Sequence, residues 1–186
     1  MLAYVFWHNP AGGVAASSYE DSLTAFHRTL AAHAPSGFRG SAAFTFRGAP
    51  WFPAESGYLD WYKVEDFAGL GALNDAAVAG ARKDPHDKVA QLAGAGVGGL
   101  YRLVAGRADF AGVTIGTWLK KPDGMGYSTF LDQVLMLIDP SSMGLWQRQL
   151  SLGPGLEFCL LSAKRVKTPE AFSAVTIEML NLLNKP

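Results

Sequence analysis

The sequence predicts an α+β protein built from two similar halves. Segments that alternate between apolar and polar residues, as strands do, are interleaved with segments whose apolar residues recur at helical spacing. The order of strands and helices starts again near residue 113. Hydrophobic residues make up 49% of the 186 positions and charged residues only 17%, so the chain can bury a substantial core.

In the first half, the aromatic segment 2–8 stops at the breakers Asn9-Pro10-Ala11-Gly12-Gly13 and predicts a first strand. Ser17, with Glu20 three residues later, predicts the N-cap of a helix. Segments 41–47 and 58–64 predict two further strands, which we expect to pair as a hairpin. The apolar stripe of the helix consists of Tyr19, Leu23, Phe26 and Leu30.

A second helix is predicted from Phe67, with an interruption near Gly80 and Pro85 and a continuation over 86–93. The following run Gly94–Gly99 matches the dinucleotide fingerprint G-x-G-x-x-G. That fingerprint follows a strand and opens a helix, whereas this run follows a helical pattern and leads into a predicted strand at 99–105. We therefore interpret the run as a flexible connector.

The second half, residues 109–186, repeats the scheme of residues 1–108. It predicts a strand over 113–119, a helix around Phe130, strands at 146–150 and 156–161, and a last helix opened by Thr168-Pro169. The stripe of that last helix would be Phe172, Val175, Met179 and Leu182. No final strand is predicted for this half.

The order βαββαβ is that of a ferredoxin-like module, in which helices cover one face of an antiparallel sheet. The bare face must be buried against something else. We expect two fused ferredoxin-like halves to stack their bare sheets and to leave a pocket between them.

Composition and charge exclude several classes of protein. Sixteen Lys and Arg balance sixteen Asp and Glu, and no basic run exceeds two residues, so nucleic acid is not an expected partner. No apolar stretch reaches about 18 residues, and the N-terminus lacks a basic segment, so we expect neither a membrane span nor a signal peptide. The single cysteine, Cys159, excludes an intrachain disulfide and favours a cytoplasmic protein.

The segment Trp61-Tyr62-Lys63-Val64-Glu65-Asp66-Phe67 is similar to the step from the third strand into the second helix of antibiotic-biosynthesis monooxygenase-like proteins. With the order of elements, it makes the chain resemble the dimeric α+β barrel superfamily, whose modules pair or fuse around a central cavity. Members often place a histidine in the helix that follows, where this chain has Leu70, so the chain departs from the haem-degrading and monooxygenase members. The resemblance also implies that Asn9 binds substrate, since some cofactor-independent oxygenases of the superfamily use an asparagine near the end of the first strand. The alternative is that Asn9 is a turn residue before Pro10.

His8 and Asp60 are the candidate catalytic residues. Alternation places His8 on one face of the first strand and Asp60 on one face of the third, and these two strands are neighbours in the expected topology. If both faces point into the cavity between the halves, the carboxylate would orient the histidine and raise its pKa, which suits a general base for a phenol or enol. The alternative is that His8 caps the end of the strand and contacts water.

Aromatic residues on these two strands are candidates for substrate binding. They would form an apolar pocket for a small apolar or aromatic molecule, although a packed core uses the same residues and is the favoured interpretation of Trp7. The candidates are Tyr4, Phe6, Tyr58, Trp61 and Tyr62.

The remaining histidines and motifs predict neither a zinc site nor a nucleophilic hydrolase. His27, His33 and His86 lack the spacing of a zinc site and are interpreted as surface or helix-end residues. There is no G-x-S-x-G element, and no cofactor or metal is expected. Two functional hypotheses follow: a monomeric or homodimeric, cofactor-independent monooxygenase or isomerase, or a non-catalytic ligand-binding or assembly module.

Overall fold

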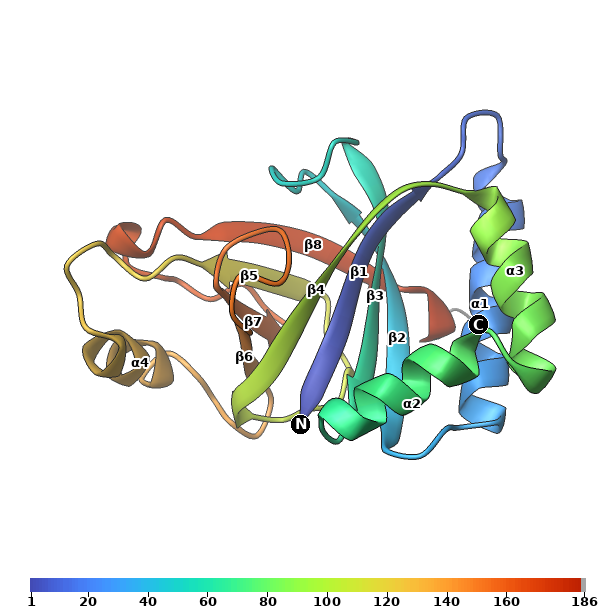
Figure 1. The fold of residues 1–186 in the computed structure, drawn as a ribbon. Helices are drawn as coiled ribbons and strands as arrows, with labels where there is room; N and C mark the ends of the chain where they lie inside the picture. Colours follow the sequence, from blue (N-terminus) through green and yellow to red (C-terminus); the bar gives the residue numbers. More distant parts are fainter. Residues whose placement is uncertain (185–186) are drawn as a thin grey trace.

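The computed structural model describes residues 1–184 and shows a closed barrel of eight antiparallel strands with helices on its outside (Figure 1). The strands are β1 (Leu2–Pro10), β2 (Phe38–Arg47), β3 (Ser56–Val64), β4 (Ala93–Gly106), β5 (Ile115–Leu119), β6 (Gly144–Arg148), β7 (Phe158–Ser162) and β8 (Val175–Asn181). The helices are α1 (Ala16–Ala32), α2 (Phe67–Ala77), α3 (Lys83–Leu92) and α4 (Tyr127–Leu135), with short 3₁₀ turns at Gly80–Arg82, Glu170–Phe172 and Leu182–Asn184.

The barrel consists of two arcs that meet at two seams. Its strands follow the order β1-β3-β2-β8-β5-β7-β6-β4, so the first four strands of the chain are neighbours and the last four are neighbours. At one seam Phe44–Phe46 of β2 pairs with β8, and at the other Tyr101–Gly106 of β4 pairs with β6. These two pairings close the sheet, which leaves no exposed strand edge in the barrel.

Tryptophan side chains fill the inside of the barrel. Trp7, Trp61, Trp118 and Trp146 are fully buried, one from each of four strands. Trp7 lies 5.1 Å from Trp118, and Trp61 lies 5.4 Å from Trp146, measured between ring centroids. Because residues of both arcs make up this core, burial of its apolar surface holds the two arcs together. The core interpretation of Trp7 is therefore correct.

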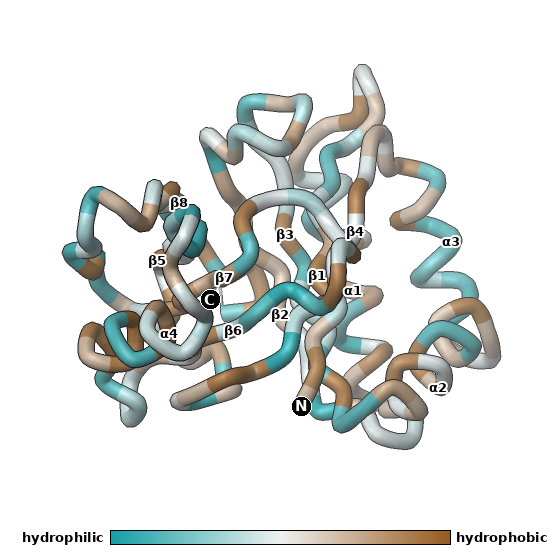
Figure 2. Tube along the Cα trace, turned by 60° about the vertical axis from the view of Figure 1, so that its left-hand side comes forward, coloured by the Kyte–Doolittle hydropathy of each residue, from teal (hydrophilic) through white to brown (hydrophobic). Residues whose placement is uncertain are grey.

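The helices α1, α2 and α3 lie over the outer face of the first arc, on the right in Figure 1. The apolar stripe predicted for α1 is confirmed, since all four of its members are buried against the sheet. Ser17 is not the N-cap of this helix, which begins at Ala16 after Ala15. Asp66 caps α2, because its carboxylate accepts a hydrogen bond from the Gly69 N–H at 2.9 Å. In Figure 2, α3 is largely hydrophilic, as expected of a helix whose only fully buried residue is Val89.

The C-terminal prediction was wrong. The segment assigned to a last helix forms a 3₁₀ turn and then the strand β8, which supplies the final strand that the second half was expected to lack. In β8, Val175, Ile177 and Met179 alternate inward to the barrel core, a spacing of two that coincides in part with a helical stripe. Strand pairing on both sides decides the outcome in favour of the strand.

The Gly94–Gly99 run is not a flexible connector, because it forms the first part of β4 and pairs with β1. The glycines have a steric reason: a Cβ at Gly96 would lie 2.4 Å from the Phe6 ring, and one at Gly98 would lie 2.4 Å from the Tyr4 hydroxyl. Side chains at these two positions would displace both rings.

None of the helices in residues 1–184 is long and apolar enough to cross a membrane.

Candidate functional site

A cavity of about 870 Å³ lies between the first arc of the barrel and its three covering helices. Residues of β1 and β3 form its floor, and residues of α1, α2 and α3 form its walls. Phe67 and Val78, at the two ends of α2, also line it and are 58% and 51% exposed, so the cavity opens to solvent along this helix. Of the predicted site residues, Tyr4, Phe6, His8, Asp60 and Tyr62 line this cavity.

The cavity lies on the opposite side of the sheet from the one predicted. We expected the faces that carry His8 and Asp60 to point between the two halves, but they point to the helices. The large apolar residues Trp7 and Trp61 occupy the inner face, and an ionised carboxylate placed among them would pay a high desolvation cost. The polar face therefore turns outward, where helices shield it from water.

His8 and Asp60 are in contact. His8 Nε2 lies 3.1 Å from Asp60 Oδ2, and the two residues are only 1% and 2% exposed. The interpretation of His8 as a water-exposed strand cap is therefore wrong. The other ring nitrogen, Nδ1, lies 2.6 Å from the hydroxyl of Tyr19 on α1. This histidine thus joins a carboxylate on the sheet to a phenol on the helix.

A second buried histidine, His27 of α1, completes the cluster. Its Nε2 lies 3.4 Å from Asp60 Oδ2, and its Nδ1 lies 2.7 Å from the hydroxyl of Ser41. Tyr62 donates a hydrogen bond of 2.7 Å to the same carboxylate oxygen. The interpretation of His27 as a surface or helix-end residue is wrong, since it is 1% exposed and lies within α1. Its spacing could have revealed it, because Tyr19, Leu23 and His27 are each four residues apart on one helix face.

Two buried polar atoms of the cluster have no hydrogen-bond partner within the described chain. They are Asp60 Oδ1 and His8 Nε2. The contact of His8 Nε2 with Asp60 has the distance of an ion pair, but its geometry does not make a hydrogen bond. Leaving a buried carboxylate oxygen without a donor is costly, so a donor from a bound molecule would be stabilised there.

The electrostatics of the cluster keep Asp60 ionised and its tyrosines neutral. Burial on its own would raise the pKa of Asp60, but the electrostatic attraction of His8 and His27 outweighs burial and holds that pKa well below its usual range. Burial, together with the charge of Asp60, raises the pKa values of Tyr62 and Tyr19 well above that of free tyrosine. The cluster can therefore exchange protons while its phenols stay protonated.

Aromatic rings form a stacked row beside the cluster. Going along the sheet, the rings of His27, Tyr62, Tyr4, Phe6 and His8 follow one another with centroid separations of 5.0–6.2 Å and small interplanar angles. Gly96 and Gly98 of β4 leave the space that the rings of Phe6 and Tyr4 occupy. This row offers a planar apolar molecule an aromatic surface to pack against.

Three predicted site residues lie away from this cavity. Trp61 points into the barrel core. Tyr58 donates a hydrogen bond to Glu20, and burial together with that carboxylate raises its pKa to about 12. Asn9 belongs to β1 and donates to the Pro10 carbonyl, so it is neither a turn residue nor part of the cavity lining. His86, expected at the surface, is half-buried and does line the cavity, whereas His33 ends α1 as an exposed residue.

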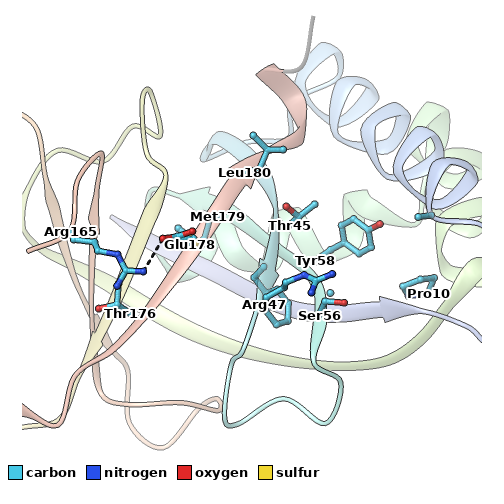
Figure 3. Close-up of a pocket in the computed structure, with 13 residues that line it drawn as sticks. Pro10, Thr45, Arg47, Ser56, Tyr58, Arg165, Thr176, Glu178, Met179 and Leu180 are labelled. Carbon is cyan, nitrogen blue, oxygen red and sulfur yellow. Dashed lines mark hydrogen bonds and ion pairs between the residues drawn. The ribbon is translucent and has the colours of Figure 1, made fainter.

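A second hollow, of about 740 Å³, lies at the seam between β2 and β8 (Figure 3). Tyr58 is the predicted site residue that reaches it. Its charged side chains are exposed and paired: Arg165 with Glu178 at 2.8 Å, and Arg47 with Glu55 at 3.8 Å. None of the buried, unpartnered polar side chains of residues 1–184 lines it. The cavity of the first arc is therefore the better candidate.

Within residues 1–184, no group of three or more His, Cys, Asp and Glu side chains is arranged to hold a metal ion.

Comparison with known proteins identifies the architecture. No protein-family model matches the sequence, and no curated protein matches it. Among solved structures, an anthrone oxidase-like protein matches with a TM-score of 0.56 at 8% identity, over 97% of this chain and 90% of that one. A "putative monooxygenase" from Lactobacillus acidophilus NCFM matches with a TM-score of 0.54 at 9% identity, over 97% and 93%. A "putative chlorite dismutase" matches with a TM-score of 0.50 at 11% identity, over 98% and 96%. The chain therefore shares the α+β barrel fold of these three proteins.

Proposed function

We propose that the cavity of the first arc binds a small, largely apolar or aromatic molecule and removes a proton from it. One observation carries the proposal: a buried, ionised Asp60 leaves one carboxylate oxygen without a partner in a cavity whose other walls are mostly apolar. A hydroxyl or acidic C–H of the bound molecule would meet the polar cluster, while its flat body lies on the rings of Tyr4 and Phe6.

Removal of a proton leaves an anion on the aromatic molecule. That anion can take back a proton at another atom, which is an isomerisation. Alternatively, it can donate electrons to dioxygen, which would then be the co-reactant of a cofactor-independent oxygenation. The names of the structurally similar anthrone oxidase-like protein and monooxygenase favour the second reaction.

We also propose that residues 1–108 and 109–186 are two fused ferredoxin-like halves. In support, the strand orders β4-β1-β3-β2 and β8-β5-β7-β6 follow the same pattern when each half is numbered from its own first strand. The second half replaces its second helix with the 3₁₀ turn Glu170–Phe172. On this proposal, only the first half retains a helix layer deep enough for a cavity.

A thermal-shift screen tests ligand binding. Flat hydroxylated aromatics and quinones should raise the melting temperature, because a ligand at about 100 times its Kd adds about 2.7 kcal/mol to the stability. Leu70→Glu, at the cavity, should abolish the shift, and Leu180→Glu, at the second hollow, should preserve it. Absence of a shift with every compound, or a shift that is lost only in Leu180→Glu, would contradict the proposed site.

Separate substitutions of His8 and Asp60 distinguish an enzyme from a binding module. In an enzyme, His8→Gln should still bind the ligand found in the screen but should lose its conversion, followed by chromatography of the bound compound with and without dioxygen. Ligand that is bound and returned unchanged by the wild type would favour a non-catalytic module.

A further inference from the structure

We infer that Tyr19 is the residue that receives the substrate proton. His8 then accepts the hydroxyl proton of Tyr19, and Asp60 stabilises the protonated His8. The inference rests on the proposed proton removal and adds its route. The sequence predicts His8 itself as the base. However, the side chain of Tyr19 on α1 also lines the cavity, and its hydroxyl contacts the His8 ring.

The position of the proton on His8 follows from its two neighbours. Nε2 lies 3.1 Å from a carboxylate oxygen, so a lone pair there would face a negative charge, whereas an N–H there is stabilised. In the neutral ring the proton is therefore on Nε2, and Nδ1 carries the lone pair. The Tyr19 hydroxyl, 2.6 Å away, then donates its hydrogen to Nδ1.

This arrangement leaves His8 with no free basic atom. Nε2 carries a proton, and the lone pair of Nδ1 is already occupied by the Tyr19 hydroxyl. The oxygen of Tyr19, by contrast, has lone pairs that can accept a hydrogen bond from a molecule in the cavity. A substrate proton thus reaches the imidazole only through Tyr19.

The proton balance is complete without any other reactant. The substrate O–H or C–H bond breaks and leaves its electron pair on the substrate. The proton goes to the Tyr19 oxygen, and the hydroxyl proton of Tyr19 moves at the same time to His8 Nδ1. The resulting imidazolium is stabilised by Asp60. Because Tyr19 never carries a negative charge, its raised pKa does not oppose this transfer.

Tyr62 also touches both the cavity and the cluster, but it is the weaker candidate. Its hydroxyl donates to Asp60, and the low pKa of that carboxyl makes it a poor final acceptor. Tyr19 alone among the described tyrosines has an imidazole nitrogen within 3 Å of its hydroxyl. The other groups that face Tyr19 are Tyr58 on β3, with its carboxylate partner Glu20, and Asp60.

Two measurements test the route. Nitrogen-15 NMR of histidine-labelled protein should find neutral His8 protonated on Nε2, and protonation on Nδ1 would overturn the inference. The second measurement uses 4-nitrophenol, whose neutral and ionised forms absorb at different wavelengths, with nitrobenzene as the analogue that lacks the hydroxyl. In the wild type, the bound phenol should ionise at a pH at least one unit lower than in Tyr19→Phe.

Control variants separate the outcomes. Tyr58→Phe, which removes a neighbouring hydroxyl outside the cavity, should behave as the wild type, and His8→Gln should behave as Tyr19→Phe. Nitrobenzene should bind equally to all four proteins. Equal ionisation of 4-nitrophenol in wild type and Tyr19→Phe, with His8→Gln impaired, would show direct transfer to His8 and refute the route. Failure of both probes to bind the wild type would refute the proposed function, and the inference with it.

Discussion

The two halves of the barrel bury their helix layers in different ways. In the first half, the interface between sheet and helices contains the ionised Asp60 and two histidines and surrounds a cavity. In the second half, the corresponding interface beneath α4 contains a hydrophobic cluster packed around Phe130, which lies 4.8 Å from Phe158 and 4.9 Å from Phe172 between ring centroids. The same layer thus surrounds a cavity in one half and contains a packed apolar cluster in the other.

This difference shows where the chain gives up stability. Close packing of apolar side chains stabilises a layer, whereas a cavity loses dispersion contacts and a buried charge costs desolvation. The second half and the tryptophan core of the barrel offset these costs for the first half. Six substitutions can test the comparison.

The largest effect is expected for a leucine in the solid layer. Leu145→Ala should lower the free energy of unfolding by about 4 kcal/mol, because the fully buried side chain leaves a void in close packing. Leu23→Ala, at the cavity wall, should cost about 2 kcal/mol, since that leucine already borders empty space. Urea denaturation measures both values, and equal losses would contradict the comparison.

Asp60→Asn should cost about 3 kcal/mol at neutral pH, because it removes a buried charge that accepts a hydrogen bond from Tyr62 and contacts His8 and His27. The folded-state pKa of Asp60 is lowered, so the unfolded state binds more protons as the pH falls below the ordinary value of about 3.9. Wild-type stability should therefore fall with decreasing pH from about pH 4 downward, and that fall should be smaller in Asp60→Asn. Parallel pH profiles of unfolding for the two proteins would rule out a stabilising role for the charge.

Gly98→Ala should destabilise the protein by about 2 kcal/mol, because its Cβ would overlap the Tyr4 ring on the cavity floor. Gly71→Ala is the matched control on α2, where a Cβ meets nothing within 4 Å. It should leave the stability unchanged or raise it by up to about 1 kcal/mol, since alanine favours a helix. Thermal melts compare the two, and a neutral Gly98→Ala would mean that the glycine run has no steric role.

The smallest effect is expected at the second hollow. Arg165→Ala removes an exposed ion pair with Glu178 and should change the stability by less than about 1 kcal/mol. It should also leave binding to the first-half cavity unchanged in the thermal-shift assay. Loss of that binding would move the candidate site to the seam between β2 and β8.

Much of the first half follows from local pattern. The strand breakers after Pro10 and the stripe of α1 act within a few residues, and alternation puts His8 and Asp60 on faces that two neighbouring strands bring together. Val175 and Met179 fit both a spacing of two and a spacing of four, so their pattern does not separate a helix from β8. The glycines of β4 resemble a connector because their purpose, room for Tyr4 and Phe6, lies on another strand.

The sequence by itself determined that this chain folds as a strand-and-helix protein and which side chains share a face, because both depend on residues close together along the chain. Only the tertiary structure decided which face turns inward and that Tyr19 and His27 of α1 join Asp60. Those outcomes depend on a competition across the closed barrel: four tryptophans and an ionised carboxylate cannot share one interior, and burial of the larger apolar area prevails.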